Sequence, residues 1–372
     1  MTTAAIAQPL PDRRFMDLAL ALGRRGLGRT WPNPAVGAVV VRDGIIVGRG
    51  WTQAGGRPHA EVEALARAGE AARGATLYVT LEPCSHHGKS PPCADAVIAA
   101  GIARVVSAIE DPNPEVAGQG HARLRAAGLA VDVGPGADEA ARDHAGHIRR
   151  VTQGRPHVIL KLALSADGRI GGAGNARVMI TGEAARARVH LMRAQSDAIL
   201  VGIGTALADD PLLTCRLPGM ESRSPLRVVL DRELRLPPAS RLVQGARTVP
   251  LWIFSSDAAS AAKATALETL GARVIRVREM DGGLALPAVL AELSRRGITR
   301  LLVEGGARVA AAFIAAGLVD EAWLFRSAMT IGPGGVPALA DLPLTALTGS
   351  ADFRIHARET VGDNALTIYE RT

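Results

Sequence analysis

The chain has 372 residues, of which 48% are apolar, so it is long enough for two globular domains that each bury a sizeable core. The net charge of +7 is spread along the sequence without a long basic run, and aromatic residues make up only 3%. This composition argues against a nucleic-acid-binding protein, which gathers basic and stacking side chains, and suits at most small phosphorylated ligands.

The cysteine count and the apolar runs bear on location. Three cysteines are too few for a disulfide framework, which predicts a reducing compartment. The first residues lack a basic stretch followed by an apolar segment, and no apolar run reaches the length of a membrane span. These features predict a cytoplasmic protein with no membrane association.

The first half of the sequence alternates between helical and strand patterns. Residues 12–28 repeat apolar residues at helical spacing behind Asp12, which we expect to cap that helix. Asp43-Gly44 separates two apolar runs as a hairpin turn does. The other elements expected here are strands at 36–41, 45–49, 76–81, 105–109 and 129–133 and helices at 60–72, 94–100 and 119–127.

The second half follows a connection at 134–155, where Gly-Pro-Gly precedes a charged helix ending in two arginines. We therefore expect two domains, 1–150 with its core at 12–133, and 156–372. Strand and helix patterns alternate again after Pro156, which indicates an α/β sheet. The expected strands are 157–164, 197–202, 227–231, 249–254, 273–277, 300–304, 320–327 and 364–370, and the expected helices are 182–194, 257–270, 287–296 and 305–316.

The densest set of chemistry-bearing residues lies between His59 and Cys93. His59, Cys84 and Cys93 offer one imidazole and two thiols, and three protein ligands leave a fourth tetrahedral position open for water, as in a catalytic zinc site. Glu61 lies two residues after His59 and is placed to move protons for that water, as in zinc-dependent deaminases. A His-x-Glu or a buried cysteine alone is a weak signal, but their conjunction predicts a deaminase.

The spacing of the two cysteines is unusual for a deaminase. Deaminases that act on free bases or on tRNA show Pro-Cys-x-x-Cys, whereas eight residues, including two histidines and a lysine, separate Cys84 from Cys93. A tRNA-type base deaminase shares the zinc ligands, but it needs a coherent basic face and leaves more than half of this chain unexplained. A non-catalytic, zinc-stabilised binding protein, in which Glu61 is incidental, is the other alternative.

Two segments of the second half are candidates for binding a dinucleotide phosphate. Gly202-Ile-Gly-Thr-Ala-Leu207 begins like a Rossmann glycine motif, but it lacks the third glycine and an acidic residue at the ribose position. Val303-Glu-Gly-Gly306 is the better candidate, because two glycines at a strand end let backbone N–H groups approach a phosphate at the start of the next helix. A tight turn without a ligand fits the same spacing.

The motifs together resemble the RibD family of bifunctional riboflavin-biosynthesis enzymes. The resemblance covers about residues 12–371 in the family's order, and the long cysteine loop is its most specific part. It implies an α/β protein whose N-terminal three-layer domain is like cytidine deaminase and whose C-terminal domain is like dihydrofolate reductase. The matching segments are His59–Glu61, Thr80–Cys93, Asp111–Pro114, Leu162–Gly168, Arg193–Gln195, Ala208–Pro211 and Val303–Gly306.

The resemblance implies two successive reactions. Zinc-dependent hydrolysis first deaminates a diaminopyrimidinone that carries a ribosylamine phosphate, and NADPH then reduces the ribosyl group to ribityl. The implied cofactors are zinc and NADPH/NADP+. The implied partners are phosphorylated pyrimidines, and no nucleic acid is expected to bind. The implied assembly is a homo-oligomer, either a dimer or a tetramer. His59, Cys84 and Cys93 match the zinc ligands of the family, and Glu61 matches its proton shuttle.

The resemblance also assigns roles outside the zinc motif. In the first domain it implies substrate contacts by Asn33, His86 and Lys89, of which Lys89 suits a ribose phosphate. In the second domain it implies that Lys161 and Glu304 assist opening of the ribose ring. The substrate positions there are Arg193, Leu213, Arg216 and Glu304, and the cofactor positions are Ala163, Met179, Thr205, Asp209, Arg232, Gly306 and Ala307.

Three positions depart from the family pattern, because Arg177, Met179 and Arg232 stand where Ser, Trp and Ser are usual. Each role also has a plainer alternative: a solvated loop charge for Lys89, and surface ion pairs for the arginines at the substrate positions. Cys215 is expected to have no role. The histidines expected to be ordinary polar residues are His87, His121, His144 and His147.

Overall fold

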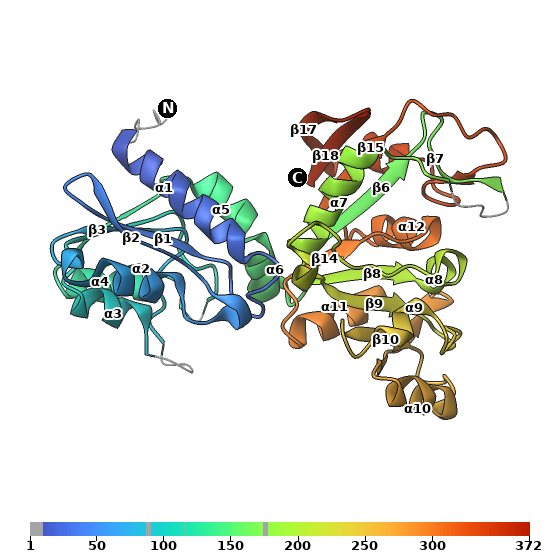
Figure 1. Cartoon of the computed structure of the whole chain (residues 1–372), viewed down its shortest axis with the longest axis horizontal. Coiled ribbons are helices and arrows are strands. Elements are labelled where there is room, and N and C mark those ends of the chain that lie inside the picture. The colour runs from blue at the N-terminus through green and yellow to red at the C-terminus, as the bar shows by residue number, and fades with distance from the viewer. Residues whose placement is uncertain (1–9, 87–90, 115, 174–177) are drawn as a thin grey trace. The chain divides into compact units, whose positions relative to one another are not determined.

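The computed structural model describes residues 10–86, 91–114, 116–173 and 178–372 (Figure 1). Contacts within the chain separate two compact units, the first ending at Gly154 and the second beginning at Arg155. Among the helices of the described ranges, none has both the length and the apolar character that crossing a bilayer requires.

The first unit contains a five-stranded sheet with helices on both faces. Its elements are α1 (Leu10–Gly23), β1 (Gly37–Arg42), β2 (Ile45–Trp51), α2 (Ala60–Ala68), β3 (Thr76–Val79), α3 (Cys93–Ala99), β4 (Arg104–Ser107), α4 (Gln119–Ala126), β5 (Ala130–Val133), α5 (Ala137–Asp143) and α6 (Ala145–Gln153). The strand order is β2-β1-β3-β4-β5, with β1 antiparallel to both neighbours and the others parallel. One face packs against α2, α3 and α4 and the other against α1 and α5, which gives three layers.

The β1–β2 hairpin forms where the sequence predicted it. Asp43 and Gly44 have φ angles of 51° and 75°, as the two central residues of a type I′ turn require. The returning strand then passes directly beneath α2, because a Cβ atom on Gly50 would lie 2.3 Å from the carbonyl oxygen of Ala60. This close approach fixes the start of α2, and with it the residue that precedes Ala60.

Asp12 does not cap α1 as expected, since the helix already begins at Leu10. Its buried carboxylate instead accepts a hydrogen bond from the hydroxyl of Tyr78 at 2.7 Å and two from the guanidinium of Arg104 at 2.9 and 2.8 Å. The interaction joins α1 to β3 and β4. The expected connection at 134–155 likewise holds two helices, α5 and α6, where the sequence indicated one.

The second unit is built on a nine-stranded sheet in the order β11-β10-β9-β8-β14-β6-β15-β18-β17. Its strands are β6 (His157–Leu164), β8 (Ala198–Gly202), β9 (Leu226–Leu230), β10 (Leu251–Ser255), β11 (Arg273–Arg276), β14 (Arg300–Val303), β15 (Glu321–Arg326), β17 (Phe353–Val361) and β18 (Asn364–Arg371). All neighbours are parallel except β15–β18 and β17–β18. The helices are α7 (Glu183–Ala194), α8 (Ile203–Asp209), α9 (Arg241–Gln244), α10 (Ala261–Thr269), α11 (Leu286–Arg295), α12 (Ala307–Ala315) and α13 (Thr345–Thr348).

Short elements complete this unit. They are two antiparallel strand pairs, β7 (Arg169–Gly171) with β16 (Val336–Pro337) and β12 (Glu279–Met280) with β13 (Gly283–Leu284). The sequence patterns predicted neither pair.

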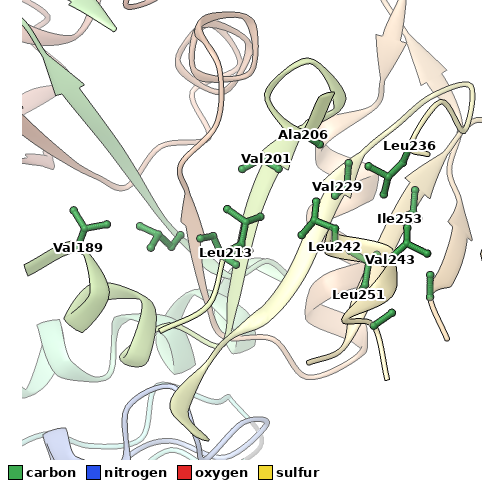
Figure 2. Close-up of a cluster of buried hydrophobic side chains, with 14 of the residues drawn as sticks. Val189, Val201, Ala206, Leu213, Val229, Leu236, Leu242, Val243, Leu251 and Ile253 are labelled. Atoms are coloured by element: carbon green, nitrogen blue, oxygen red, sulfur yellow. The ribbon is translucent and has the colours of Figure 1, made fainter. Parts of the chain in front are cut away.

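One cluster of buried side chains joins α7 to the middle of the large sheet (Figure 2). Val201, Val229 and Ile253 come from the neighbouring strands β8, β9 and β10. Val189 of α7 and Leu213, which lies outside any regular element, belong to the same cluster. Each fully buried Val or Leu contributes about 1.5–3 kcal/mol, so the cluster holds α7 and the segment around Leu213 in fixed places on the sheet.

Candidate functional site

His59, Cys84 and Cys93 converge in the first unit. His59 is the N-cap residue of α2, Cys84 lies in the loop that follows β3, and Cys93 is the first residue of α3. Nδ1 of His59 lies 3.2 Å from Sγ of Cys93 and 3.8 Å from Sγ of Cys84. One donor atom from each residue lies within 4.8 Å of the others.

These three residues fit a zinc ion. Zn–N distances near 2.1 Å and Zn–S distances near 2.3 Å at tetrahedral angles separate donor atoms by about 3.5–3.8 Å. A hydrogen bond from Cys93 lowers the pKa of the Cys84 thiol to about 4 against the opposing effect of burial, and the amide N of Cys93 lies 3.3 Å from the Cys84 sulfur. The same thiol–thiol hydrogen bond raises the pKa of Cys93, and metal binding displaces the proton that the pair retains.

Glu61 lies beside this ligand set, in the first turn of α2, with only 3% of its surface exposed. Burial raises the pKa of its carboxyl group to about 7, and the nearby charge of His59 opposes that rise. A carboxyl group with such a pKa can both accept and release a proton near neutral pH. Glu61 therefore has the position and the acidity that a proton shuttle needs.

The other residues predicted for this site are the substrate contacts Asn33, His86 and Lys89. Nδ2 of Asn33 donates to the carbonyl oxygen of Gly56 at 2.8 Å, and a Cβ on Gly56 would lie 2.4 Å from that nitrogen. Gly56 has a φ of 85°, so a larger residue there would be strained and would displace Asn33. His86 is exposed in the loop after Cys84, and Lys89 lies outside the described residues.

Glu82 supports the site in a way that the sequence analysis did not anticipate. Its buried carboxylate accepts three hydrogen bonds of 3.0 Å from backbone N–H groups of the segment 111–121, which anchors that segment next to Cys84. Glu82, Glu110 and His121 also form a second cluster of possible metal ligands. The carboxylate of Glu82 is already satisfied by the backbone, so this cluster is read as structural. No sequence pattern separates such a glutamate from a solvated one.

Two histidines of the first unit make the ordinary polar contacts that were expected of them. Nε2 of His144 lies 3.0 Å from Oγ1 of Thr80, and Nε2 of His147 lies 3.0 Å from Oδ1 of Asp111.

The second unit contains a buried charged group of Lys161, Arg193 and Glu304. Arg193 donates through Nε and Nη2 to the two carboxylate oxygens of Glu304 at 2.7 and 2.8 Å, and the side chains are 12% and 7% exposed. Burial alone would raise the pKa of Glu304, but the charges of Arg193 and Lys161 outweigh it and lower that pKa to about 2. Burial also lowers the pKa of Lys161, against the attraction of Glu304.

This ion pair bears on the role expected of Arg193, which was to contact the substrate. Its third nitrogen, Nη1, donates to the carbonyl oxygen of Thr214 at 3.1 Å, so the guanidinium is committed to protein groups. The ion pair considered as the alternative for the arginines is present at Arg193. The pair is buried, however, and not a surface pair.

The expected cofactor residues meet where α8 and α12 begin. Gly306 has a φ of 57°, and a Cβ on it would lie 2.9 Å from Oγ1 of Thr205. A Cβ on Gly305 would lie 2.6 Å from Cα of Val201, so α12, which begins at Ala307, can approach β8 closely only with glycine here. A glycine-lined helix start with free N–H groups suits a phosphate, and these residues therefore fit a dinucleotide cofactor.

The remaining cofactor positions lie on other parts of this unit. Ala163 pairs with Phe325 between β6 and β15, Asp209 is exposed at the end of α8, and 56% of Met179 is exposed. Arg177 lies outside the described residues. Arg232 donates to the carbonyl oxygen of Gly282 at 2.8 Å and to Oε1 of Glu233 at 2.6 Å.

The two remaining substrate positions are neighbours in one segment. Leu213 is 4% exposed, backbone included. The side chain of Arg216 is exposed. Cys215 between them is buried and is a free thiol, as expected.

Comparisons with known proteins bear on both units. Residues 10–109 match the family model described as the cytidine and deoxycytidylate deaminase zinc-binding region, and residues 156–363 match the RibD C-terminal domain. The fold and the zinc motif thus define a zinc-binding deaminase joined to a pyrimidine reductase. More particularly, the chain belongs to the RibD family of riboflavin biosynthesis.

Relatives extend over nearly the whole chain. The riboflavin biosynthesis protein RibD of Escherichia coli strain K12 is 42% identical over 353 residues, which span 90% of this chain and 94% of the relative. That of Bacillus amyloliquefaciens is 44% identical over 329 residues, 88% and 87% of the two chains. The structure of Acinetobacter baumannii RibD in form 1 has a TM-score of 0.86 at 35% identity and covers 97% and 99%.

A Thermotoga maritima structure is equally similar, with a TM-score of 0.84 at 35% identity and the same coverage. It bears the name diaminohydroxyphosphoribosylaminopyrimidine deaminase/5-amino-6-(5-phosphoribosylamino)uracil reductase. Membership of the family confirms the predicted fold, with a cytidine-deaminase-like domain and a dihydrofolate-reductase-like domain. It also confirms the predicted pairing of a deaminase with a reductase, and zinc and NADPH as the cofactors.

Proposed function

We propose that the chain catalyses the two consecutive reactions for which its Thermotoga maritima relative is named. The first deaminates 2,5-diamino-6-(ribosylamino)pyrimidinone 5'-phosphate. The second reduces the ribosyl side chain with NADPH and gives 5-amino-6-(ribitylamino)uracil 5'-phosphate. The observation that carries the proposal is the convergence of His59, Cys84 and Cys93 beside the buried Glu61.

In the deaminase site, His59, Cys84 and Cys93 hold the zinc, which when bound activates a water molecule for attack on the amine-bearing ring carbon. Glu61 takes up the proton that the water releases and delivers it to the departing amine. Burial, which raises the pKa of this carboxyl group, favours its uptake of that proton.

Substrate contacts in this site are assigned to residues of two loops. Asn33, fixed by the carbonyl of Gly56, orients the pyrimidine ring. Lys89 and His86, in the loop between the two cysteine ligands, bind the ribose phosphate, which deaminases of free bases never meet.

In the reductase site, the cradle of Thr205, Gly306 and Ala307 binds NADPH, which supplies the hydride. Ala163, Met179, Asp209 and Arg232 are assigned to the same cofactor. We assign the proton that opens the ribose ring to Nζ of Lys161, because burial lowers the pKa of this amine and eases its release of a proton. Glu304 has a pKa of about 2, so it is an ionised hydrogen-bond acceptor for a substrate hydroxyl.

Phosphate recognition in the second unit is assigned to Arg216, whose side chain is exposed, and the neighbouring Leu213 is assigned to the same substrate. Arg193 serves the same substrate through Glu304, which it holds ionised.

The test separates the two sites by supplying each substrate in turn. Glu61→Gln keeps the size of the side chain and all three zinc ligands, but removes the basic carboxylate. Deamination should fall by about 10²–10⁴-fold, with zinc content unchanged and with normal NADPH oxidation when the deaminated intermediate is supplied. Asp209→Ala should show the converse. A folded, zinc-loaded Glu61→Gln protein that has lost both activities would disprove the assignment of two sites.

Two further expectations belong to this proposal. A cytoplasmic location is supported by three free cysteines, which suit a reducing compartment. A homo-oligomer, dimer or tetramer, follows from the family resemblance, and sedimentation velocity of the full chain would show a monomer if that expectation is wrong.

A further inference from the structure

The segment from Asp210 to Arg216 follows α8 and has no regular secondary structure, yet it buries Leu213 and Cys215. Leu213 has a φ of 55°, a left-handed conformation that strains a residue with a Cβ atom. Figure 2 shows its side chain within the cluster that also contains Val189 of α7. Strained conformations persist only where their surroundings determine them, so the contacts that hold this segment matter.

Side chains hold successive backbone groups of the segment. The contacts are Arg193 Nη1 to Thr214 O at 3.1 Å, Cys215 N to Ser224 Oγ at 3.1 Å and Arg216 N to His190 Nδ1 at 3.2 Å. His190 and Arg193 lie three residues apart on α7 and therefore on the same side of the helix. One side of α7 thus holds both the segment 213–216 and, through Arg193, the carboxylate of Glu304.

We propose that His190 is a positioning residue of the reductase, which fixes the backbone of Arg216 so that the segment 213–216 can bind the phosphorylated pyrimidine. The inference rests on the proposed reductase function of this unit. Nδ1 of His190 accepts the hydrogen bond from Arg216, so this nitrogen carries no proton, and the neutral ring is the functional form.

The charges that face His190 favour its neutral form. Burial, and after it the positive charges of Arg193 and Arg216, lower the pKa of His190. The charge of Glu304 and the backbone of Thr214 act in the opposite direction without cancelling that effect. The acceptor is therefore present at neutral pH. It is lost as the pH falls through the lowered pKa, and the backbone N–H of Arg216 then loses this contact.

Three variants test the inference with the deaminated pyrimidine phosphate and NADPH as substrates. His190→Leu removes the acceptor at similar size, and His190→Asn keeps one, because its Oδ1 lies close to the position of Nδ1. Arg186→Leu is the matched control, since Arg186 is exposed on the same helix and donates to the carbonyl of Thr181.

His190→Leu should raise the KM for the pyrimidine phosphate by about threefold to tenfold, as expected for one lost hydrogen bond. The KM for NADPH and the deaminase activity should not change. His190→Asn should stay within about twofold of the unaltered protein, and Arg186→Leu should equal it. Equal KM values for the Leu and Asn variants of His190, or no change in either, would overturn the inference.

The pH dependence of KM provides a further test, because a purely structural role of His190 would not change it. As the pH is lowered from 7 to the lowest pH at which the protein stays folded, the KM of the unaltered protein should rise more than that of His190→Asn, which has no imidazole to titrate. The comparison is needed because a phosphate monoester itself titrates near pH 6. Parallel profiles for the two proteins would count against His190, even if His190→Leu does not fold.

The outcomes also separate this inference from the function on which it rests. If the unaltered protein does not oxidise NADPH with the deaminated substrate, the reductase assignment itself fails. If the unaltered protein is active and the His190 variants behave like it, only the role of His190 fails.

Discussion

Removing the guanidinium of Arg193 tests the buried ion pair between Arg193 and Glu304. In Arg193→Met, Glu304 remains 7% exposed but loses both hydrogen bonds, of 2.7 and 2.8 Å. The fall in the pKa of Glu304 from an ordinary 4.5 to about 2 corresponds to about 3 kcal/mol. Breaking a buried ion pair by removing one partner costs about 3–5 kcal/mol, which agrees with that figure.

The pH dependence has a definite sign. Because the pKa of Glu304 is lowered in the folded protein, its contribution to stability is fully present above pH 4.5 and is lost as the pH falls toward 2. In Arg193→Met, the charge of Lys161 still lowers that pKa, but the larger effect of Arg193 is gone and burial moves the pKa upward from about 2. The variant therefore takes up its proton at a higher pH, and the difference in stability between the two proteins should be largest at pH 7 and shrink as the pH falls toward 2.

Thermal unfolding of the second unit measures the effect, and a loss of about 3 kcal/mol should lower its Tm by about 6–12 °C at pH 7. Arg295→Met is the matched control, because Arg295 also donates twice to one carboxylate, that of Glu292, at 2.8 and 2.9 Å. Arg295 is 68% exposed, and an exposed pair contributes less than about 1 kcal/mol. Equal losses of Tm in the two variants, or a larger loss at pH 5 than at pH 7, would refute the reasoning.

Four further substitutions should have separable effects. Cys93→Ser should lose zinc and deaminase activity together, whereas Cys215→Ser should change neither, and elemental analysis of the purified proteins would show stoichiometric zinc in the first variant if the ligand assignment is wrong. Lys89→Ala should raise the KM of the deaminase for its phosphorylated substrate by about tenfold or more with zinc retained, since a charge-assisted contact contributes about 1.5–3 kcal/mol; an unchanged KM would indicate that Lys89 is a solvated loop charge. Asp12→Ala should leave Arg104 without its buried partner and lower the stability of the first unit by about 2–4 kcal/mol in chemical denaturation, and a change below 1 kcal/mol would contradict that account.

The zinc site could be predicted from the sequence because its chemistry depends on residue types. Only a few side chains bind zinc, and His59, Cys84 and Cys93 are separated by segments whose helix and strand patterns are strong. The start of α2 at Ala60 and of α3 at Cys93 follow from those patterns. The hairpin at Asp43 could also be predicted from the sequence, because few residues readily adopt the left-handed conformation that its turn requires.

The strand at the edge of the large sheet could not be predicted from the sequence in the same way. The strand β17 was missed, because most of its residues are exposed and only every fourth one, Phe353, Ala357 and Val361, is partly buried. An edge strand with one solvated face and charged side chains has little apolar periodicity to detect.

The reductase site was predicted only through family resemblance, and the structure shows why spacing could not reveal it. Arg193 and Glu304 lie 111 positions apart, and the sequence around neither residue indicates that the two form an ion pair. His190 was not singled out, because a histidine on an amphipathic helix has no local signal for the backbone group that it bonds. Contacts between side chains and a distant backbone depend on the tertiary fold, which local patterns do not contain.

The charges around Glu304 also indicate which of two residues, Glu304 or Lys161, can donate a proton in the proposed reduction. A carboxylate held ionised by Arg193 cannot release a proton near neutral pH, whereas Lys161 next to it has its pKa lowered by burial. The two groups therefore differ in role for an electrostatic reason, and the guanidinium of Arg193 sets that difference. Arg193 also holds the carbonyl of Thr214, so the residue that fixes the ionisation of Glu304 also positions the segment that carries Arg216.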